Sequence, residues 1–172
     1  MHNLIVREAQ PEDAARCIEY MQTLAAEANI GIGLSAGEFT LTVEQEAQFI
    51  QEMAQSDNSL FLVAEVDGRI IGVLTMQGGK RKSNHHAASL GITAAKGYRN
   101  QGVGNALMQA VVAWAKASGT LKRIGLTVYT DNQPAIHLYE KYGFVVEGQS
   151  KKAIFRDGQF HDVLQMALLL EE

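Results

Sequence analysis

The 172-residue sequence contains a single cysteine, two prolines and one tryptophan. The single cysteine, Cys17, excludes an internal disulfide, and a chain without disulfides suits the reducing cytosol. No stretch approaches the roughly 18 consecutive apolar residues that a membrane-spanning helix needs. The first residues also lack the apolar core and cleavage site of a secretory signal peptide. We therefore expect a cytoplasmic protein without a membrane partner.

An excess of positive charge is also missing. Lysine and arginine number 15 against 19 aspartate and glutamate residues, which gives a formal net charge of −4. General binding of nucleic acid needs a basic face, so we expect no nucleic-acid partner. Lys80-Arg81-Lys82 is a local exception, which is explained either by a solvated loop or by docking of an outlying phosphate of an acidic ligand.

The order of apolar and turn-forming residues predicts a mixed α/β (α+β) fold. No repeat, linker or low-complexity tract divides the chain, so we predict one domain over residues 1–172. Asp67-Gly68 between two apolar runs predicts a hairpin turn. The expected strands cover residues 4–8, 60–66, 69–76, 87–93 and 123–129, the helices cover 11–28, 42–54, 106–117 and 134–142, and a last hairpin covers 144–170 with its turn at 156–159.

Residues 29–39, with three glycines, form the longest irregular segment. Long loops are often functional, and we expect this one to lie beside a ligand. Cys17 lies in a predicted helix with no histidine to activate it, which favours a packed thiol over a nucleophile.

A glycine turn after the strand at 87–93 is the first candidate site. It reads Tyr98-Arg99-Asn100-Gln101-Gly102-Val103-Gly104. A helix that begins behind such a turn presents free backbone amides, which can hold phosphate oxygens. A Walker A motif is excluded because Val103 stands where its lysine is needed, and a Rossmann fingerprint because its third glycine is replaced by Leu107. The remaining alternative is a helix that merely begins at glycines.

A short helix that carries a tyrosine is the second candidate. It reads Asn132-Gln133-Pro134-Ala135-Ile136-His137-Leu138-Tyr139-Glu140-Lys141-Tyr142-Gly143-Phe144. Asn132 is placed to cap the helix and Gly143 to end it. We expect Ala135 and Leu138 to pack on the sheet, with Tyr139 at the edge of that face and His137 exposed or structural. Taken alone, Tyr139 could equally be an ordinary, partly buried aromatic residue.

Together the two motifs resemble the signature motifs of the GCN5-related N-acetyltransferase (GNAT) superfamily. The resemblance implies a central, mostly antiparallel sheet flanked by helices, with acetyl-CoA in the cleft between the central strands. It implies transfer of an acetyl group from acetyl-CoA to a primary amine, with no metal. In that family Tyr139 would protonate the departing sulfur and Asn132 would anchor the cofactor. The implied cofactor-binding residues are Ile92, Thr93, Arg99, Asn100, Gln101, Gly102, Val103, Gly104, Asn105, Asn132 and Tyr139.

Within the superfamily the chain is most similar to bacterial amino-acid N-acetyltransferases, on residues 86–92, 126–128 and 148–166. The expected acceptor is therefore a small free amine such as an amino acid, and homodimers occur in such families. The alternatives are a protein or peptide amine as acceptor, or a regulatory module that binds acyl-CoA without catalysis.

Ser89 departs from the family pattern, because relatives often carry an acidic residue there that could serve as the general base. A serine hydroxyl cannot accept the amine proton at neutral pH without another base. His85 and His86 would lie about 10–13 Å along the strand from it, at about 3.3 Å per residue, and they lack further metal ligands nearby. The identity of the base is therefore open.

Overall fold

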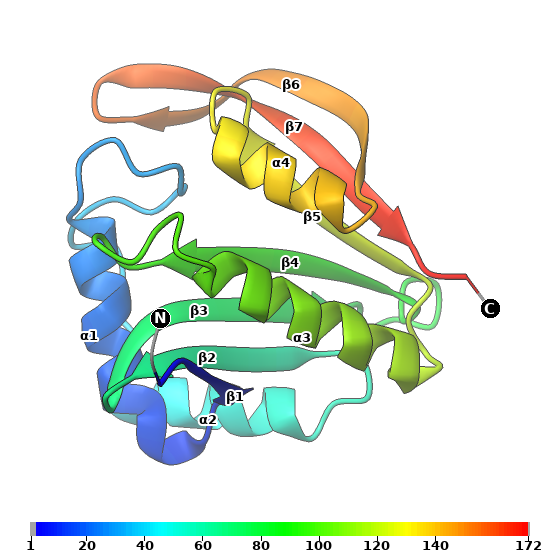
Figure 1. The fold of residues 1–172 in the computed structure, drawn as a ribbon, viewed down its shortest axis with the longest axis horizontal. Coiled ribbons are helices and arrows are strands. Elements are labelled where there is room, and N and C mark those ends of the chain that lie inside the picture. Colours follow the sequence, from blue (N-terminus) through cyan, green and yellow to red (C-terminus); the bar gives the residue numbers. More distant parts are fainter. Residues whose placement is uncertain (1–2, 172) are drawn as a thin grey trace.

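A computed structural model describes residues 3–171, so the domain expected over 1–172 is described without residues 1, 2 and 172. Within the described part, the strands form one seven-stranded sheet in the order β1-β2-β3-β4-β5-β7-β6 (Figure 1). The elements are β1 (Ile5–Glu8), the 3-10 helix η1 (Pro11–Asp13), α1 (Ala14–Ala25), α2 (Val43–Ala54), β2 (Leu60–Val66), β3 (Arg69–Gly78), β4 (Ala87–Ala94), α3 (Val103–Ser118), β5 (Arg123–Tyr129), α4 (Gln133–Lys141), β6 (Val145–Arg156) and β7 (Gln159–Leu169).

The sheet is mostly antiparallel, as predicted. Within the described sheet β4 and β5 pair parallel, and every other pair of neighbouring strands is antiparallel. The hairpin between β2 and β3 turns at Asp67 and Gly68, whose φ angles are 49° and 76°. The hairpin between β6 and β7 turns at Asp157 and Gly158, at 51° and 75°. Both turns were predicted from their Asp-Gly pairs, which tolerate positive φ.

Helices cover both faces of the sheet. Side chains alternate between faces along a strand, so Leu62 and Leu74 join the core beneath α3, whereas Phe61, Val63 and Val73 join the core beneath α1 and α2. Figure 1 shows α3 crossing in front of β3 and β4, and α4 lying along β5 and β7. The described helices lack the combination of length and apolar character that a membrane crossing demands.

The sheet opens between its two central strands. The parallel pairing of β4 with β5 covers only Ala87–Ser89 and Arg123–Gly125. Both strands continue beyond that point, β4 to Ala94 and β5 to Tyr129. Residues 90–94 therefore keep β3 as their neighbour and have no partner strand on the β5 side. The divergence leaves a strand edge with free backbone groups inside the protein.

Two helices differ from their predicted bounds. The helix predicted over 11–28 consists of η1 followed by α1, and α1 ends at Ala25. The α3 helix begins at Val103 rather than at 106, because the turn at Gly102 leads directly into it. In α4, Ile136 and Tyr139 are the buried residues, whereas Ala135 and Leu138 are only partly buried. The expectation that Ala135 and Leu138 pack on the sheet is confirmed, since both pack against its core, although Ile136 and Tyr139 are more deeply buried.

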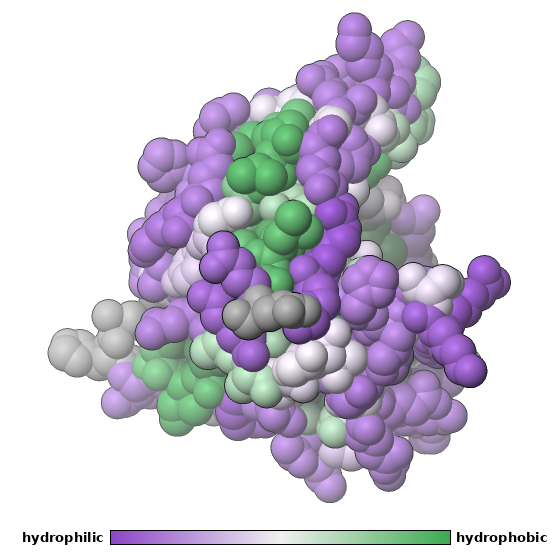
Figure 2. Space-filling view, turned by 90° about the vertical axis from the view of Figure 1, so that its right-hand side faces the viewer, coloured by the Kyte–Doolittle hydropathy of each residue, from purple (hydrophilic) through white to green (hydrophobic). Residues whose placement is uncertain are grey.

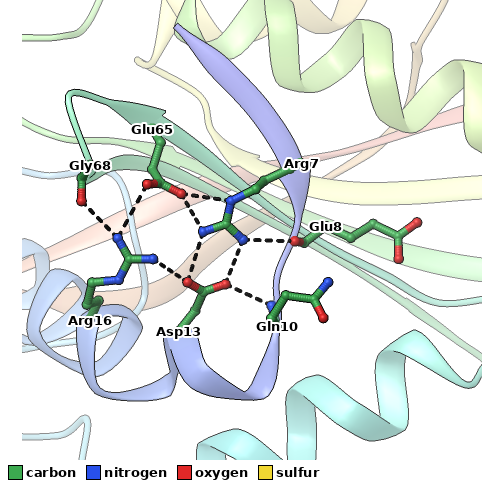
Figure 3. A network of polar contacts seen from close by, with 7 residues as sticks. All are labelled: Arg7, Glu8, Gln10, Asp13, Arg16, Glu65 and Gly68. Carbon is green, nitrogen blue, oxygen red and sulfur yellow. Dashed lines mark hydrogen bonds and ion pairs between the residues drawn. The ribbon is translucent and has the colours of Figure 1, made fainter.

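A network of ion pairs fastens β1 to the start of α1 (Figure 3). The buried carboxylate of Asp13 accepts hydrogen bonds from Arg7, at 2.7 and 2.9 Å, and also pairs with Arg16. Glu65 on β2 pairs with both arginines. Arg16 also donates to the carbonyl of Gly68, at 2.8 Å. The charges alternate in sign, so each carboxylate has cations on both sides.

Figure 2 shows one side of the molecule, on which apolar residues gather among hydrophilic ones. The exposed apolar residues of the chain include Val145 and Val146, where β6 begins, and Leu169, where β7 ends. β6 is an edge strand of the described sheet.

Candidate functional site

A cavity of about 740 Å³ lies where β4 and β5 diverge. Its wall combines the loop between α1 and α2, the strands β3, β4 and β5, the glycine turn, and the first turns of α3 and α4. All five residues of the unpaired part of β4 line it: Leu90, Gly91, Ile92, Thr93 and Ala94. A ligand in this cavity could therefore hydrogen-bond to β4 much as an added strand would.

The start of α3 provides a second set of free donors. Gly102 is the N-cap residue, with φ of 91° and no side-chain cap. The amide of Ala106 donates to the Gly102 carbonyl at 3.0 Å. The amides of Val103, Gly104 and Asn105 precede that bond and have no helical carbonyl to bind. Such amides at the positive end of a helix dipole favour an anion.

Arg99 lies beside this turn and is already engaged. Its guanidinium donates to the Ala94 carbonyl at 2.9 Å and pairs with both carboxylate oxygens of Glu27. The hydrogen bonds from Arg99 are the largest of the influences that hold the pKa of Glu27 below its usual value. Arg99 thus lines the cavity with its charge partly compensated, and joins the glycine turn to the end of α1.

Seven of the eleven predicted cofactor-binding residues line the cavity among the described residues: Ile92, Thr93, Arg99, Asn100, Gly104, Asn132 and Tyr139. Gln101, Gly102, Val103 and Asn105 are not in its wall. The Gln101 side chain donates to the Gly97 carbonyl, and Val103, 1% exposed, belongs to the core. The Asn105 side chain accepts hydrogen bonds from Lys141 and Tyr142. These four can contribute backbone groups, because their side chains point elsewhere or are absent.

Tyr139 is the predicted catalytic residue, and its hydroxyl lies in a dry setting. The residue is 6% exposed, and its burial raises the pKa of the phenol to about 12. The hydroxyl has no hydrogen-bond partner among residues 3–171, although every fully enclosed side-chain nitrogen and oxygen there has one. It therefore keeps contact with the cavity that the residue lines. A neutral phenol placed in this way can donate a proton to a group in the cavity.

Asn132 caps α4, as predicted. Its Oδ1 accepts from the amide of Ala135 at 3.3 Å. The Nδ2 group lies so close to Gly31 that a Cβ there would come within 3.1 Å of it. The absence of a side chain at Gly31 thus allows the loop between α1 and α2 to approach α4.

That loop forms one wall of the cavity and is held by β6. Arg156, 3% exposed, donates to the carbonyls of Ala25, Glu27, Ile30 and Leu34. The irregular segment 29–39 lines the cavity with Ile30, Gly31, Ile32, Gly33 and Phe39, and its place beside a ligand stays a prediction.

The residues considered for a general base lie elsewhere. Ser89 is exposed and stands in the paired part of β4, outside the cavity wall. His85 is bound to Asp57 and to the carbonyl of Gly79. His86 is exposed and does not line the cavity.

Glu46 on α2 is a buried carboxylate in the cavity wall that was not predicted from the sequence. The signal was present in the helical spacing. Glu46 shares the buried face of α2 with Ile50 and Met53, so a charged residue occupies a position in an apolar stripe. Thr42 and Gln45 form a capping box at the start of that helix.

Comparison with known proteins agrees with this architecture. Residues 32–144, more than half of the chain, match the acetyltransferase (GNAT) family. The L-amino acid N-acetyltransferase AaaT of Escherichia coli (strain K12) is 41% identical over 106 residues, which make up 62% of this chain and 65% of that relative. The chain thus aligns with slightly less than two thirds of that relative's length.

Solved structures extend the match to nearly the whole chain. An acetyltransferase of the GNAT family from Streptococcus pneumoniae is 37% identical, with a TM-score of 0.94 and coverage of 98% of this chain and 100% of that one. The fold is shared with yncA from Salmonella typhimurium, solved with its cofactor acetyl-CoA, at a TM-score of 0.85, 18% identity, and coverage of 99% and 95%. The chain belongs to the acetyltransferase (GNAT) family.

Proposed function

We propose that this protein transfers the acetyl group of acetyl-CoA to the primary amine of a small molecule. The observation that carries the proposal is one continuous cavity that joins three features: the free amides where α3 begins, the unpaired edge of β4, and the hydroxyl of Tyr139. Family membership and a neighbour of the same fold solved with acetyl-CoA support it.

Each feature has a role suited to one part of acetyl-CoA. The amides of residues 103–105 would hold the diphosphate, with Arg99 beside them. The edge of β4 would hydrogen-bond the pantetheine arm and polarise the thioester carbonyl. As the amine nitrogen bonds to the carbonyl carbon and the carbon–sulfur bond breaks, Tyr139 would donate its proton to the sulfur. Arg99, Gly104, Tyr139 and residues 90–94, to which these roles are proposed, all line the cavity.

The acceptor is proposed as a small free amine, of which an amino acid is one member. Support comes from the size of the cavity, about 740 Å³, and from the similarity to AaaT, an L-amino acid N-acetyltransferase. We also propose that residues 1–172 form one acetyltransferase domain that works in the cytoplasm. Assembly as a homodimer stays a prediction.

The activity is tested by incubating the protein with acetyl-CoA and a panel of amines, and measuring the release of free CoA thiol. The panel includes amino acids, their decarboxylated counterparts, polyamines and peptides with free N-termini. We expect turnover with at least one small amine. Turnover confined to peptides would show that the acceptor is a peptide amine rather than a small free amine. CoA binding without turnover on any amine would favour a regulatory module.

Binding at the glycine turn is tested with Gly104→Val. A Cβ at Gly104 would lie 3.0 Å from Cδ2 of Leu138, and both residues line the cavity. We expect CoA affinity to fall about tenfold or more, equivalent to about 1.4 kcal/mol or more. Ala117→Val on the same helix is the control, because Ala117 is exposed and lies outside the cavity wall. Equal CoA affinity in both folded variants, by calorimetric titration, would contradict the assignment.

A further inference from the structure

Glu46 is a buried carboxylate without a partner. The residue is 3% exposed, yet it lines the cavity between β4 and the helices α1 and α2. Its carboxylate forms no hydrogen bond or ion pair with any residue that the structure describes. Since every fully enclosed side-chain oxygen within residues 3–171 has a partner, both oxygens of Glu46 retain access to open space, and the cavity is the space this residue borders.

The charged groups around Glu46 do not neutralise the negative charge of its carboxylate. The neighbouring thiol of Cys17 on α1 has its pKa raised to about 12, chiefly by burial, and so stays neutral. Asp13 on η1 is paired with Arg7 and Arg16, which therefore have their own counter-charge. Burial alone raises the pKa of Glu46 above its ordinary value. An ionised carboxylate in this setting is costly until a cation arrives.

The side chains of the surrounding wall limit which kind of cationic ligand can bind beside Glu46. Glu46 and Arg99 are the charged residues in the cavity wall among the described residues, and Arg99 is held by Glu27 beside the glycine turn. Side chains from α1, α2, β2 and the loop between the two helices give the cavity an apolar wall: Met21, Phe39, Leu41, Phe49 and Phe61. Thr75, the cross-strand partner of Phe61, adds an uncharged hydroxyl group. A second negative charge on a ligand would find no free cationic side chain there.

Building on the acetyl transfer proposed above, we propose that Glu46 receives the ammonium group of the acceptor and removes its proton, and that the acceptor is an apolar primary amine without a carboxylate. The inference narrows the proposed amine class and departs from the amino-acid acceptor that the similarity to AaaT suggests, because an amino acid would bring its carboxylate into the same pocket as Glu46. It also supplies the base that Ser89 does not.

The protons balance through two groups of this chain. Glu46 takes one proton from the ammonium and becomes a neutral carboxyl group, which leaves a nucleophilic amine. The nitrogen forms its bond to the thioester carbonyl carbon, and the carbon–sulfur bond breaks. Tyr139 gives its proton to the sulfur, and the second proton lost by the nitrogen restores Tyr139. Glu46 then releases its proton to solvent, so the reaction yields amide, CoA thiol and one proton.

The test compares wild-type protein with Glu46→Gln, Glu46→Asp and a matched control, Glu44→Gln. Glu44 lies on the same helix but is exposed and outside the cavity wall, so its replacement removes the same charge without touching the pocket. The acceptor probes are pairs that differ by a carboxylate: phenethylamine against phenylalanine, and 3-methylbutylamine against leucine.

Four readouts separate a catalytic role from a structural one: kcat/KM, affinity for CoA, thermal stability and the pH profile. For Glu46→Gln we expect kcat/KM for phenethylamine to fall about 10²-fold or more, with the affinity for CoA unchanged and thermal stability equal to or above that of the wild type. The wild-type kcat/KM should rise with pH through an acidic limb that lies above about 4.3, the ordinary pKa of glutamate. Glu46→Gln should lose this limb, Glu46→Asp should keep it with lower activity, and Glu44→Gln should match the wild type.

Binding of phenethylamine is also measured by calorimetry on CoA-loaded protein, which needs no turnover. If wild-type protein binds phenethylamine through Glu46 but never acetylates an amine, the proposed acetyl transfer fails and the role of Glu46 in binding stands. If wild-type protein acetylates amines while Glu46→Gln keeps its binding affinity, kcat/KM and acidic limb, the role of Glu46 is overturned. A preference for phenylalanine over phenethylamine would overturn the acceptor class.

Discussion

Two tyrosines on or next to α4 show how neighbouring hydroxyl groups acquire different roles. Tyr142 caps the helix C-terminus and donates to the carbonyl and Oδ1 of Asn105, at 2.9 and 2.8 Å. Tyr139 is more deeply buried, and its hydroxyl faces the cavity without a protein partner among the described residues. The first hydroxyl therefore joins α4 to α3, whereas the second is free to act on a ligand.

This difference predicts opposite effects for the same substitution. Tyr139→Phe keeps the ring, including its contact with Phe144 at 5.9 Å between ring centroids, so stability and CoA affinity should change little. Its kcat should fall by about 10²-fold or more because the proton donor is lost. Tyr142→Phe should instead lower the free energy of unfolding by about 1 kcal/mol and leave kcat near the wild-type value. Single-turnover kinetics and urea unfolding measure both, and a Tyr139→Phe variant with wild-type turnover would exclude the proton transfer.

Residue identity in the site was partly predictable from the sequence. Asn132 and Tyr139 were placed by the resemblance of a whole capped helix, and Gly104 by the turn before α3. Glu46 has no motif around it, because its role depends on β3, β4 and the loop after α1 folding over the same face. Helical spacing marks Glu46 as a charged position in an apolar stripe, but its place in the cavity wall is identified only once its neighbours in space are known.

At the scale of elements, a single side chain on β6 organises the loop between α1 and α2. Arg156 spreads its guanidinium hydrogen bonds over four carbonyls of residues 25–34 and also pairs with Asp157 at 2.8 Å. The loop has few hydrogen bonds of its own, and Tyr129 adds one by donating to the Ile32 carbonyl at 2.9 Å. The position of this loop, which forms one wall of the cavity, therefore depends on β6, a strand far away in the sequence.

Arg156→Lys should show this dependence. A lysine keeps the positive charge but cannot present the planar fork that reaches several carbonyls at once. We expect a loss of about 1–3 kcal/mol in the free energy of unfolding, because buried carbonyls lose their donors, together with a severalfold higher KM for the amine. Arg123→Lys is the control, since Arg123 forms its ion pair with Glu147 on the exposed side of β5 and β6. Unfolding in urea and steady-state kinetics provide the two measurements, and equal behaviour of the two variants would refute the role.

The elements themselves were predictable where local chemistry decides them. Asp-Gly turns fixed both hairpins, and Asn132 fixed the start of α4. The start of α3 was placed three residues late, because Val103 and Gly104 read as part of the turn until the helix is seen to continue through them. The loop after α1 was predicted from residue 29, but it begins at residue 26 because α1 ends at Ala25. Its path could not be predicted, since it follows Arg156 rather than its own residues.

For the whole molecule, the central divergence of the sheet is the feature that makes a cavity in an otherwise continuous core. The resemblance predicted a cleft between central strands, and the structure has it between β4 and β5. No local pattern specifies where parallel pairing stops. The integrity of the sheet on the β1 side depends instead on packing and on the network around Asp13.

Asp13→Asn tests that network and its pH dependence. The hydrogen bonds from Arg7 hold the pKa of Asp13 well below its ordinary value of about 3.9. The folded state therefore gains stability from the ionised carboxylate at neutral pH and loses it as the pH falls below about 4, where the unfolded chain takes up the proton first. We expect Asp13→Asn to cost about 2–3 kcal/mol at pH 7 and to flatten the fall in stability between pH 5 and 3. Urea unfolding at pH 3, 5 and 7 measures this, with Glu147→Gln as the exposed control; parallel curves for Asp13→Asn and wild type would contradict it.

The Arg156 contacts also bear on how the protein reaches its folded state. They join residues separated by 122 to 131 positions, and β7 enters the sheet between β5 and β6. Contacts between such distant positions form late and slowly, because a long stretch of chain must be closed first. During synthesis the edge of β5 stays unpaired until β7 has left the ribosome, and an open edge is a template for aggregation. The loop between α1 and α2 is then the last wall of the cavity to become ordered, so the cavity of a nascent chain is incomplete until its final hairpin has closed.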